Sequence, residues 1–428
     1  MKTRLTIVLL LFTALLTAQN ISLFECYKSA RENHPLLKNK SELQIISELN
    51  QKNIQANWLP NLELNAGFNY ISEVMNFGDM QLPAMVNIEF PEMPKDQYKF
   101  SLDINQPLYD GGAVSKSKTL ELAKLNIEQQ NEEVNIYAIY EQINRLYFAM
   151  LLTEESKKLL DSYLNILDAR MKDLDSGIEN GLVLPESKDA LLAEMIKIKQ
   201  QLTELDIKRN YISQILSALT GKQFNENSAF SLPEIALPAE TTIQRPETDL
   251  FSLHNQLLTN KQELLLSQRM PKAFAFASLG YGNPPGSNYL RDEFDTYYML
   301  GVGVKWNIFD WNKTKRSRQV IEHQKSLSSN KKENFDRNIN IALNNNQSEI
   351  EKIESLIKSD RELISIREKM TQNSSEKLKN GTLSSSDYVS DLNAEKQAKI
   401  NLEIHKLQLV QSGINHLTIS GQIIQFIK

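Results

Sequence analysis

Two stretches of this 428-residue chain, residues 113–176 and 312–380, contain neither glycine nor proline. As α-helices they would each be roughly 95–100 Å long, at a rise of 1.5 Å per residue. Apolar residues recur in them at helical spacing, as at Ile136, Ile139 and Ile143, and most other positions are Gln, Asn, Lys or Glu. That pattern is typical of solvated coiled-coil helices. With only 15 Gly and 13 Pro in the whole chain, a helix-rich protein is expected.

Residues 1–18 have the pattern of a secretory signal peptide. Lys2 and Arg4 form its basic start, an apolar core follows, and Ala18 is the small residue before a predicted cut at Gln19. The apolar core is too short for a transmembrane helix, and no later run reaches the roughly 18 apolar residues that one needs. A secreted chain without a transmembrane helix is therefore predicted.

Charge and cysteine content argue against a nucleic-acid-binding protein and against a fold held by internal disulfides. The chain has 48 Lys and Arg against 53 Asp and Glu, a formal net charge of −5, which argues against nucleic acid as a partner. The single cysteine, Cys26, has no partner for an internal disulfide. It is expected to be a small buried residue on the first helix.

Four segments alternate apolar and polar residues, the pattern of a strand with two unlike faces. The second of them reads "YKFSLDINQPLYDGG" (98–112), in which the alternation ends at Pro107. The others cover about 62–70, 273–282 and 298–308. Each is close to the roughly 9–11 residues that cross a bilayer in a tilted β-strand. A single such strand also suits a half-buried soluble sheet, but four in a secreted chain favour a membrane barrel with lipid outside and water inside.

The chain contains two similar halves, offset by about 200 residues. Pro60 in "ANWLPNLELNAGFNYIS" corresponds to Pro271, Asp110 in "FSLDINQPLYDGG" to Asp310, and Gly181 in "ENGLVLPESKDALLAE" to Gly381. A period this long indicates two structural repeats and not a solenoid. Each repeat reads helix, strand, loop, strand, very long helix, tight turn, helix.

The repeats predict the following division of the chain. Residues 1–18 are the signal peptide, 19–57 the N-terminal helix, 58–110 the first strand pair with its outer loop, 111–222 the first long helical hairpin, 223–245 a linker, 246–270 a helix, 271–310 the second strand pair, 311–420 the second hairpin and 421–428 a tail. Each hairpin places one long helix beside two shorter helices stacked end to end.

Four strands cannot close into a barrel, and an open sheet edge in lipid leaves backbone groups without hydrogen bonds. Two copies would supply eight strands, which side chains fill, and three would supply twelve, which leave a water channel. The polar faces, with room left at Gly301 and Gly303, favour the trimer, while a dimer stays open. The barrel is expected to pass into helix at residues that end strands or bend the chain: Pro60, Pro107, Asp110, Gly111, Gly112, Pro271 and Asp310.

At this point the chain resembles the TolC family of outer-membrane efflux proteins. The resemblance is carried by "SLFECYKSARENHPLL" (22–37), by the strand segments above, and by "NGLVLPESKDALLAE" and "NGTLSSSDYVSDLNAE". It implies a mostly α fold with β: a homotrimer with a twelve-stranded barrel in the outer membrane and a helical tunnel in the periplasm. It also implies a passive export duct that docks a periplasmic adaptor protein and an inner-membrane transporter, for efflux or type I secretion.

The resemblance also implies roles for the two hairpin turns. Adaptor docking falls to Asn180, Gly181, Leu182, Val183, Asn380, Gly381, Thr382 and Leu383. A ring of carboxylates at the tunnel constriction falls to Asp387 and Asp391, where three-fold symmetry would attract cations. Asp387 equally suits an ordinary acidic residue at a helix N-terminus. In the first turn the position that matches Asp387 is Ser187, so an acidic side chain is missing there.

Motifs for chemistry are not found in the sequence. The five histidines have no metal-ligand spacing, and no H-E-x-x-H, nucleophile elbow, phosphate loop or CxxC occurs. Neither an enzyme nor a cofactor is predicted. The main alternative to a duct is a periplasmic coiled-coil adaptor or structural protein without its own pore, which would explain the hairpins but not the four strands.

Overall fold

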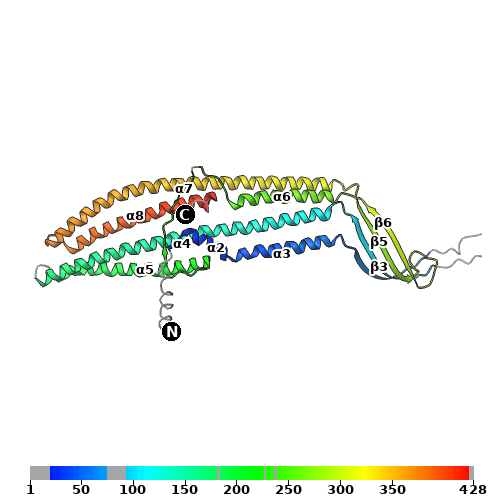
Figure 1. Ribbon diagram of the computed structural model, residues 1–428, viewed down its shortest axis with the longest axis horizontal. Coiled ribbons are helices and arrows are strands. Elements are labelled where there is room, and N and C mark those ends of the chain that lie inside the picture. Colours follow the sequence, from blue (N-terminus) through cyan, green and yellow to red (C-terminus); the bar gives the residue numbers. More distant parts are fainter. Residues whose placement is uncertain are drawn as a thin grey trace, which may run out of the picture. The chain divides into compact units, whose positions relative to one another are not determined.

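The structure is a computed structural model of the full chain. It describes residues 20–74, 93–180, 184–225, 228–235, 238 and 240–423. The predicted signal peptide, most of the first outer loop, the turn residues Gly181, Leu182 and Val183, and residues 424–428 of the tail lie outside the described residues. The described chain is mostly helical, with one antiparallel sheet (Figure 1).

The chain divides into two compact units. The hairpin unit comprises the residues up to Lys40, Gln130–Leu250 and the residues from Lys331 onward. The sheet unit comprises Ser41–Gln129 and Phe251–Asn330. The elements are, in chain order, β1 (Asn20–Ile21), α2 (Leu23–Asn33), α3 (Pro35–Ala56), β2 (Asn61–Tyr70), β3 (Asp96–Tyr109), α4 (Ala113–Glu179), the 3₁₀-helix η2 (Pro185–Lys188), α5 (Asp189–Thr220), β4 (Ala229–Phe230), α6 (Pro246–Ser267), β5 (Lys272–Asn283), β6 (Asp295–Lys305), α7 (Lys313–Lys379) and α8 (Ser385–Ser420).

The two long helices have the same length, 67 residues for α4 and 67 for α7. The single helix expected near residues 22–57 is instead two, because α2 ends at Asn33 and α3 begins at Pro35. Between them His34 is extended, with φ −70° and ψ 131°. The residue before a proline is pushed out of helical geometry, and proline itself suits only the first turn of a helix. The break therefore follows directly from Pro35.

The sheet unit contains a four-stranded antiparallel sheet in the order β2-β3-β5-β6. Each repeat's own two strands pair with each other, and β3 pairs with β5 to join the repeats. β3 runs two residues past Pro107, where the sequence predicted its end, and its pairing with β5 shifts between Pro107 and Tyr109. Proline is tolerated at such an irregularity because it has no amide hydrogen to donate to the ladder. β6 ends at Lys305, earlier than expected, so Trp306 and Ile308 follow the strand.

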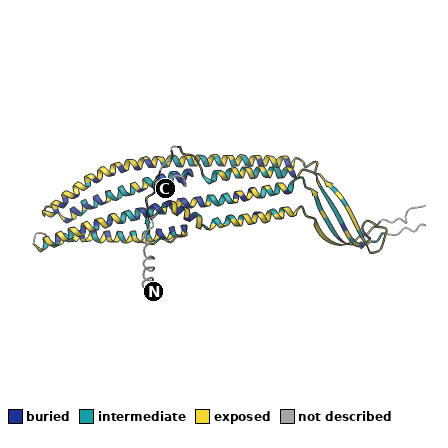
Figure 2. Ribbon diagram, in the orientation of Figure 1, coloured by how far each residue is buried: buried dark blue, intermediate teal, exposed yellow. Residues whose placement is uncertain are grey.

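One face of this sheet continues the apolar alternation and is open to its surroundings. Few residues of the strands are buried, in contrast to the helices (Figure 2). The other face is polar on β2 and β3, but on β5 and β6 it also carries the rings of Phe274, Phe276 and Tyr297, which corrects the sequence analysis. A Cβ added at Gly301 would lie 2.3 Å from Cζ of Phe276, and one at Gly303 would lie 2.5 Å from Cζ of Phe274. The two glycines thus accommodate aromatic rings and do not leave room for water.

The hairpin unit has a core where α2, α4, α5, α8 and the short strands meet. Cys26 is buried there as predicted, and burial raises the pKa of its thiol to about 12. Polar side chains within this core are paired: Tyr27 donates to Asn144, and Nδ2 of Asn144 donates to Oγ1 of Thr418 at 3.0 Å. The mature N-terminal segment is fixed by a parallel pairing of β1 with β4. A buried network of paired polar side chains such as Tyr27, Asn144 and Thr418 helps to specify how these helices are arranged.

Candidate functional site

The second hairpin turn, between α7 and α8, is built as a helix C-cap. Gly381 has φ +67°, the left-handed conformation that suits glycine. Its amide donates to the carbonyl of Leu378 at 3.0 Å, and the amide of Thr382 donates to the carbonyl of Lys377 at 2.9 Å. This pair of bonds is the Schellman motif, which satisfies the last carbonyls of a helix. The sequence Asn380–Gly381–Thr382 therefore reverses the chain without unpaired backbone groups.

The first hairpin turn, between α4 and α5, is built differently. Asn180 closes α4, and its side-chain Nδ2 donates to the carbonyl of Ser176 at 2.7 Å. After the undescribed residues, Pro185 begins a 3₁₀ turn that leads into α5. Lys188 of this turn forms an ion pair with Asp175 of α4. Ser187 stands where the second turn has Asp387. The neighbouring Lys188 thus finds its counter-ion within its own hairpin.

The two carboxylates predicted for a gate have different surroundings. The Ser384 hydroxyl caps α8, accepting from the amide of Asp387 at 3.1 Å and donating to Oδ2 of Asp387 at 2.6 Å. The Asp387 side chain is otherwise exposed. Asp391, one turn further, accepts from the Ser374 hydroxyl, and its carbonyl accepts from Oγ1 of Thr371 at 3.2 Å. Asp391 is therefore held against α7, whereas Asp387 combines a capping role with an open carboxylate.

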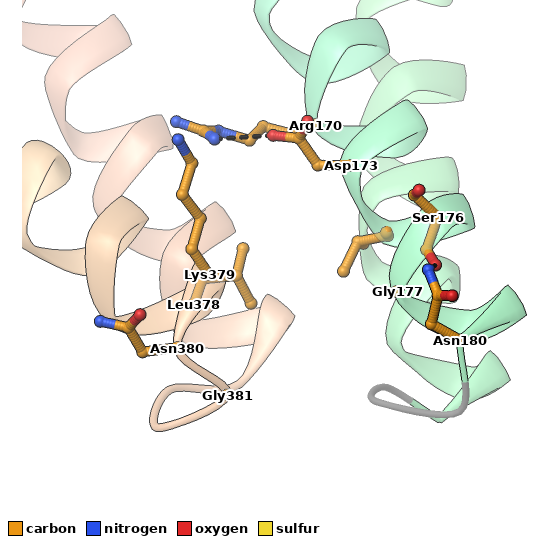
Figure 3. A pocket seen from close by; sticks show the side chains of 10 residues that line it. Arg170, Asp173, Ser176, Gly177, Asn180, Leu378, Lys379, Asn380 and Gly381 are labelled. Atoms are coloured by element: carbon orange, nitrogen blue, oxygen red, sulfur yellow. Dashed lines mark hydrogen bonds and ion pairs between the residues drawn. The ribbon is translucent and has the colours of Figure 1, made fainter.

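A cavity of about 440 Å³ separates the ends of the two hairpins. It is lined by α4 residues from Arg170 to Asn180 and by Leu378, Lys379, Asn380 and Gly381 of the second turn. Figure 3 shows Arg170 and Lys379 projecting into this space, with Arg170 paired to Asp173 at 2.9 Å. The turns that the sequence singled out separately thus face one common space.

Arg170 also joins the two hairpins. Its guanidinium donates to the Ser375 hydroxyl of α7 and lies 5.9 Å above the ring of Tyr388 on α8. Because Tyr388 is buried and adjacent to Asp387, this contact fixes the first turn of α8 against α4. Sequence reasoning missed Arg170, since one arginine on a long charged helix gives no signal of a partner some 200 residues away.

Further along, a buried ion pair joins α5 to α8. Nζ of Lys396 lies 2.7 Å from Oε1 of Glu194, and both side chains are only 8% exposed. Removing Glu194 would leave the buried Lys396 without a counter-ion, and removing Lys396 would leave Glu194 with only the exposed Lys197, at 3.9 Å. Beside it, Tyr163 of α4 donates toward Glu395 of α8, and burial together with that carboxylate raises the pKa of Tyr163. The ends of the hairpins are therefore held together by charge as well as by packing.

The predicted junctions between strand and helix lie in the sheet unit, where Pro60 and Pro271 immediately precede β2 and β5. Asp110 accepts from the amides of Gly112 and Val114 at 2.8 and 2.6 Å, and so caps α4. Asp310 caps α7, accepting from the amide of Thr314 at 2.9 Å and from its hydroxyl. These hydrogen bonds lower the pKa of Asp310, and the bond from the Thr314 hydroxyl has the larger effect. Gly111 and Gly112 have positive φ, and so do Trp311 and Asn312 at the matching positions.

Comparison with known proteins shows which family and fold the chain resembles. Residues 26–218 match the sequence profile described as outer membrane efflux protein. The fold matches the crystal structure of the transmembrane channel CusC with a TM-score of 0.69 at 10% sequence identity, over 94% of this chain and 92% of that one. The chain resembles the outer membrane efflux protein family in sequence over residues 26–218, and it has the fold of solved outer membrane channels over most of its length.

Two other solved channels show the same fold. The Campylobacter jejuni CmeC outer membrane channel matches with a TM-score of 0.64 at 14% identity, over 94% of this chain and 86% of that one. The Neisseria gonorrhoeae MtrE outer membrane channel, solved in an open state, matches with a TM-score of 0.64 at 13% identity, over 94% of this chain and 89% of that one. No curated protein matches the chain by sequence.

These similarities agree with the expected location and role. The matching profile is that of outer membrane efflux proteins, and the solved structures with this fold include outer membrane channels. Among the described helices, none has an apolar stretch that would cross a membrane. The described residues also contain no cluster of His, Cys, Asp or Glu able to hold a metal ion.

Proposed function

We propose that three copies of the chain form a closed twelve-stranded barrel in the outer membrane, continued into the periplasm by a helical tunnel. The observation that carries this proposal is the open sheet. Within the described residues β2 pairs only with β3, and β6 pairs only with β5, so both outer strands keep an unpaired edge. In lipid such edges are tolerated only when the sheet closes.

The exposed face of the sheet has the chemistry of a lipid-facing surface. Leu64 of β2 is 66% exposed, Phe100 of β3 is 50% exposed and Val302 of β6 is 78% exposed. The same face also carries Leu62, Phe68, Tyr70, Tyr98, Leu279, Tyr281, Tyr298, Leu300 and Val304. An apolar patch of this extent is rare on a soluble monomer and marks a membrane or protein contact. It argues against the alternative of a periplasmic adaptor without a pore.

The opposite face suits a water-filled interior. Asp103 lies at its centre, where Oδ2 accepts from Nδ2 of Asn65 at 2.7 Å and from the Ser101 hydroxyl at 3.1 Å, while Oδ1 accepts from the Ser278 hydroxyl at 2.5 Å. An ionised carboxylate with three donors belongs beside water and not beside acyl chains. Twelve strands leave a channel that eight do not, so the polar face supports the trimer over the dimer.

The hairpin turns are proposed as the working end of the duct. Asn180–Val183 and Asn380–Leu383 would dock a periplasmic adaptor protein, through which an inner-membrane transporter delivers cargo. Asp387 is proposed for the gate, since its carboxylate is exposed in the first turn of α8, the helix that follows the second hairpin turn. Asp391 is a weaker candidate, because Ser374 already engages it. Three copies of Asp387 around one axis would favour cations.

The assembly is tested by the mass of the mature protein in detergent, measured by native mass spectrometry. Three copies per particle are expected. A two-copy particle would contradict the twelve-stranded barrel, and a monomer soluble without detergent would return the function to a periplasmic structural protein.

Docking is tested with a photo-crosslinking amino acid at Thr382, with the exposed Glu354 in the middle of α7 as the matched control position. Capture of a coiled-coil periplasmic protein at Thr382 and not at Glu354 is expected. Equal capture at both positions, or at neither, would contradict a docking role for this turn.

A further inference from the structure

The two junctions between strand and helix differ in how their cations are used. At the start of α4, Lys116 forms an ion pair with Glu263 at 2.6 Å, and Nζ of Lys118 donates to Gln55. At the start of α7 four cations, Lys313, Lys315, Arg316 and Arg318, are all exposed, and none forms an ion pair within the part of the chain that the structure describes. Four uncompensated positive charges in six residues form an electrostatic site for an anion from outside the chain.

Some of these cations line a groove between α6 and α7. The groove has a volume of about 350 Å³, and its cationic lining is Arg269, Lys315 and Arg318, with His323 at one end. Its one carboxylate, Glu322, lies 3.6 Å from Nζ of Lys325. The amide of Thr314 at the start of α7 is already bound by Asp310. An anion in this groove would therefore bind to side chains and not to the helix N-terminus. Arginine and lysine side chains are suited to binding phosphate.

Exposed aromatic and aliphatic side chains adjoin the groove, where β6 ends. Trp306 and Ile308 are 58% and 71% exposed and continue the alternation of the apolar face of β6. Nε1 of Trp306 donates to the carbonyl of Arg269 at 3.1 Å, and Arg269 donates to the carbonyl of Ile308 at 3.2 Å. Arg269 thus links the apolar face to the groove. Tryptophan followed by cations is the order found where a protein crosses from acyl chains to headgroups.

Trp311 adds a second observation of the same kind. It is held in the left-handed region at φ +52°, which is unfavourable for a bulky residue, and it remains 78% exposed. Its ring packs against a neighbouring exposed ring, that of Phe309, with 4.9 Å between the two ring centroids. Nothing within the described chain covers either ring, which is consistent with a lipid environment.

We propose that the groove between α6 and α7 binds the phosphate of an anionic phospholipid in the membrane leaflet that faces the periplasm. The inference rests on the proposed barrel, which places the end of β6 at that leaflet. Arg269, Lys315 and Arg318 hold the phosphate, and Trp306, Phe309 and Trp311 lie among the upper parts of the acyl chains. The equivalent site at the first junction does not form, because its cations are already paired.

The test uses tryptophan fluorescence in bilayers that contain brominated lipids, which quench tryptophans they touch. The protein is the full trimer with Trp58→Phe, so that Trp306 and Trp311 are the reporters. Brominated phosphatidylglycerol is compared with brominated phosphatidylcholine at matched lipid fractions. Each cation beside an anionic lipid surface changes binding by roughly fivefold. A preference for phosphatidylglycerol is expected, and Lys315→Gln with Arg318→Gln should abolish it.

Lys116→Gln with Lys118→Gln is the matched control and should keep the preference. Equal quenching by the two lipids in the Trp58→Phe protein would overturn the phosphate site while leaving the barrel intact, and the groove would then be available to an acidic protein segment. Loss of the preference in both double variants would overturn the phosphate site, because it would show that the preference comes from the overall surface charge. Quenching by neither lipid would overturn the site together with the proposed barrel. Native mass spectrometry of each variant confirms that it still assembles.

Discussion

The two halves of the chain follow one backbone plan but use their side chains differently. In both, an aspartate is followed by two residues of positive φ and caps the helix that begins after them. These two residues are Gly111 and Gly112 in the first half, and Trp311 and Asn312 in the second. The first half pairs Lys116 at its junction and Lys188 in its hairpin turn, whereas the second half leaves Lys315 at its junction without an ion pair among the described residues. The backbone plan is thus a requirement of the fold, while the second half directs its side chains to the surroundings.

The largest effect is expected where the two halves are joined, at Glu194 and Lys396. Glu194→Leu leaves the buried Lys396 without its counter-ion and should lower the unfolding free energy by about 3–5 kcal/mol. The double variant Glu194→Leu with Lys396→Met removes both charges and should recover most of that loss. Denaturant unfolding in detergent measures both. A double variant as unstable as the single one would show that the loss does not come from an uncompensated buried charge.

The glycine at the first junction should come next. Gly111→Ala forces an alanine into φ +73°, with its Cβ 2.4 Å from Cβ of Met270. Left-handed backbone alone costs an alanine about 1–2 kcal/mol, and the clash adds to it. The midpoint temperature of thermal unfolding should fall further than for any variant at the matching Trp311. If Gly111→Ala is neutral, the junction is not rigid there.

Gly381→Ala separates the backbone term from the clash. Gly381 has a similar φ of +67°, but nothing lies within 4 Å of its added Cβ. The expected cost is about 1 kcal/mol, from the left-handed conformation alone. Thermal unfolding of both alanine variants under one condition gives the comparison. Equal costs at the two glycines would contradict the close approach at Gly111.

The smallest effect is expected at the second junction and depends on pH. Hydrogen bonds from Thr314 lower the pKa of Asp310 below its usual 3.8. A carboxyl group whose pKa is lower in the folded state stabilises the fold above its unfolded pKa and loses that contribution as the pH falls below about 3.8. Asp310→Asn should therefore destabilise near neutral pH and differ less from the parent protein in acid. A difference that grows in acid would contradict the capping role of the ionised carboxylate.

Much of the sheet could be predicted from sequence because its determinants are local. Alternation of apolar and polar residues placed the strands, and Asp110, Asp310 and Gly381 marked the ends of helices by their own chemistry. The exceptions were also local in cause. Pro35 breaks the first helix, and Pro107 is tolerated inside β3 because the pairing is irregular there.

The interior of the hairpin unit could not be predicted in the same way. Glu194 and Lys396 look like ordinary charges on solvated helices, and only tertiary packing shows that they are buried against each other. Phe274 and Phe276 reveal their role only through the register that sets them opposite Gly303 and Gly301. Such contacts join residues distant in sequence, which a pattern within one helix or strand cannot specify.

Single-channel recording in a planar bilayer examines the proposed duct as a whole. Purified protein should give a small, cation-selective conductance, and Asp387→Ala should raise it and reduce the selectivity, because three carboxylates leave the constriction together. Conductance that is unchanged by the substitution would remove Asp387 from the gate and keep the channel. Monodisperse protein that inserts into the bilayer and never conducts would contradict the twelve-stranded barrel itself.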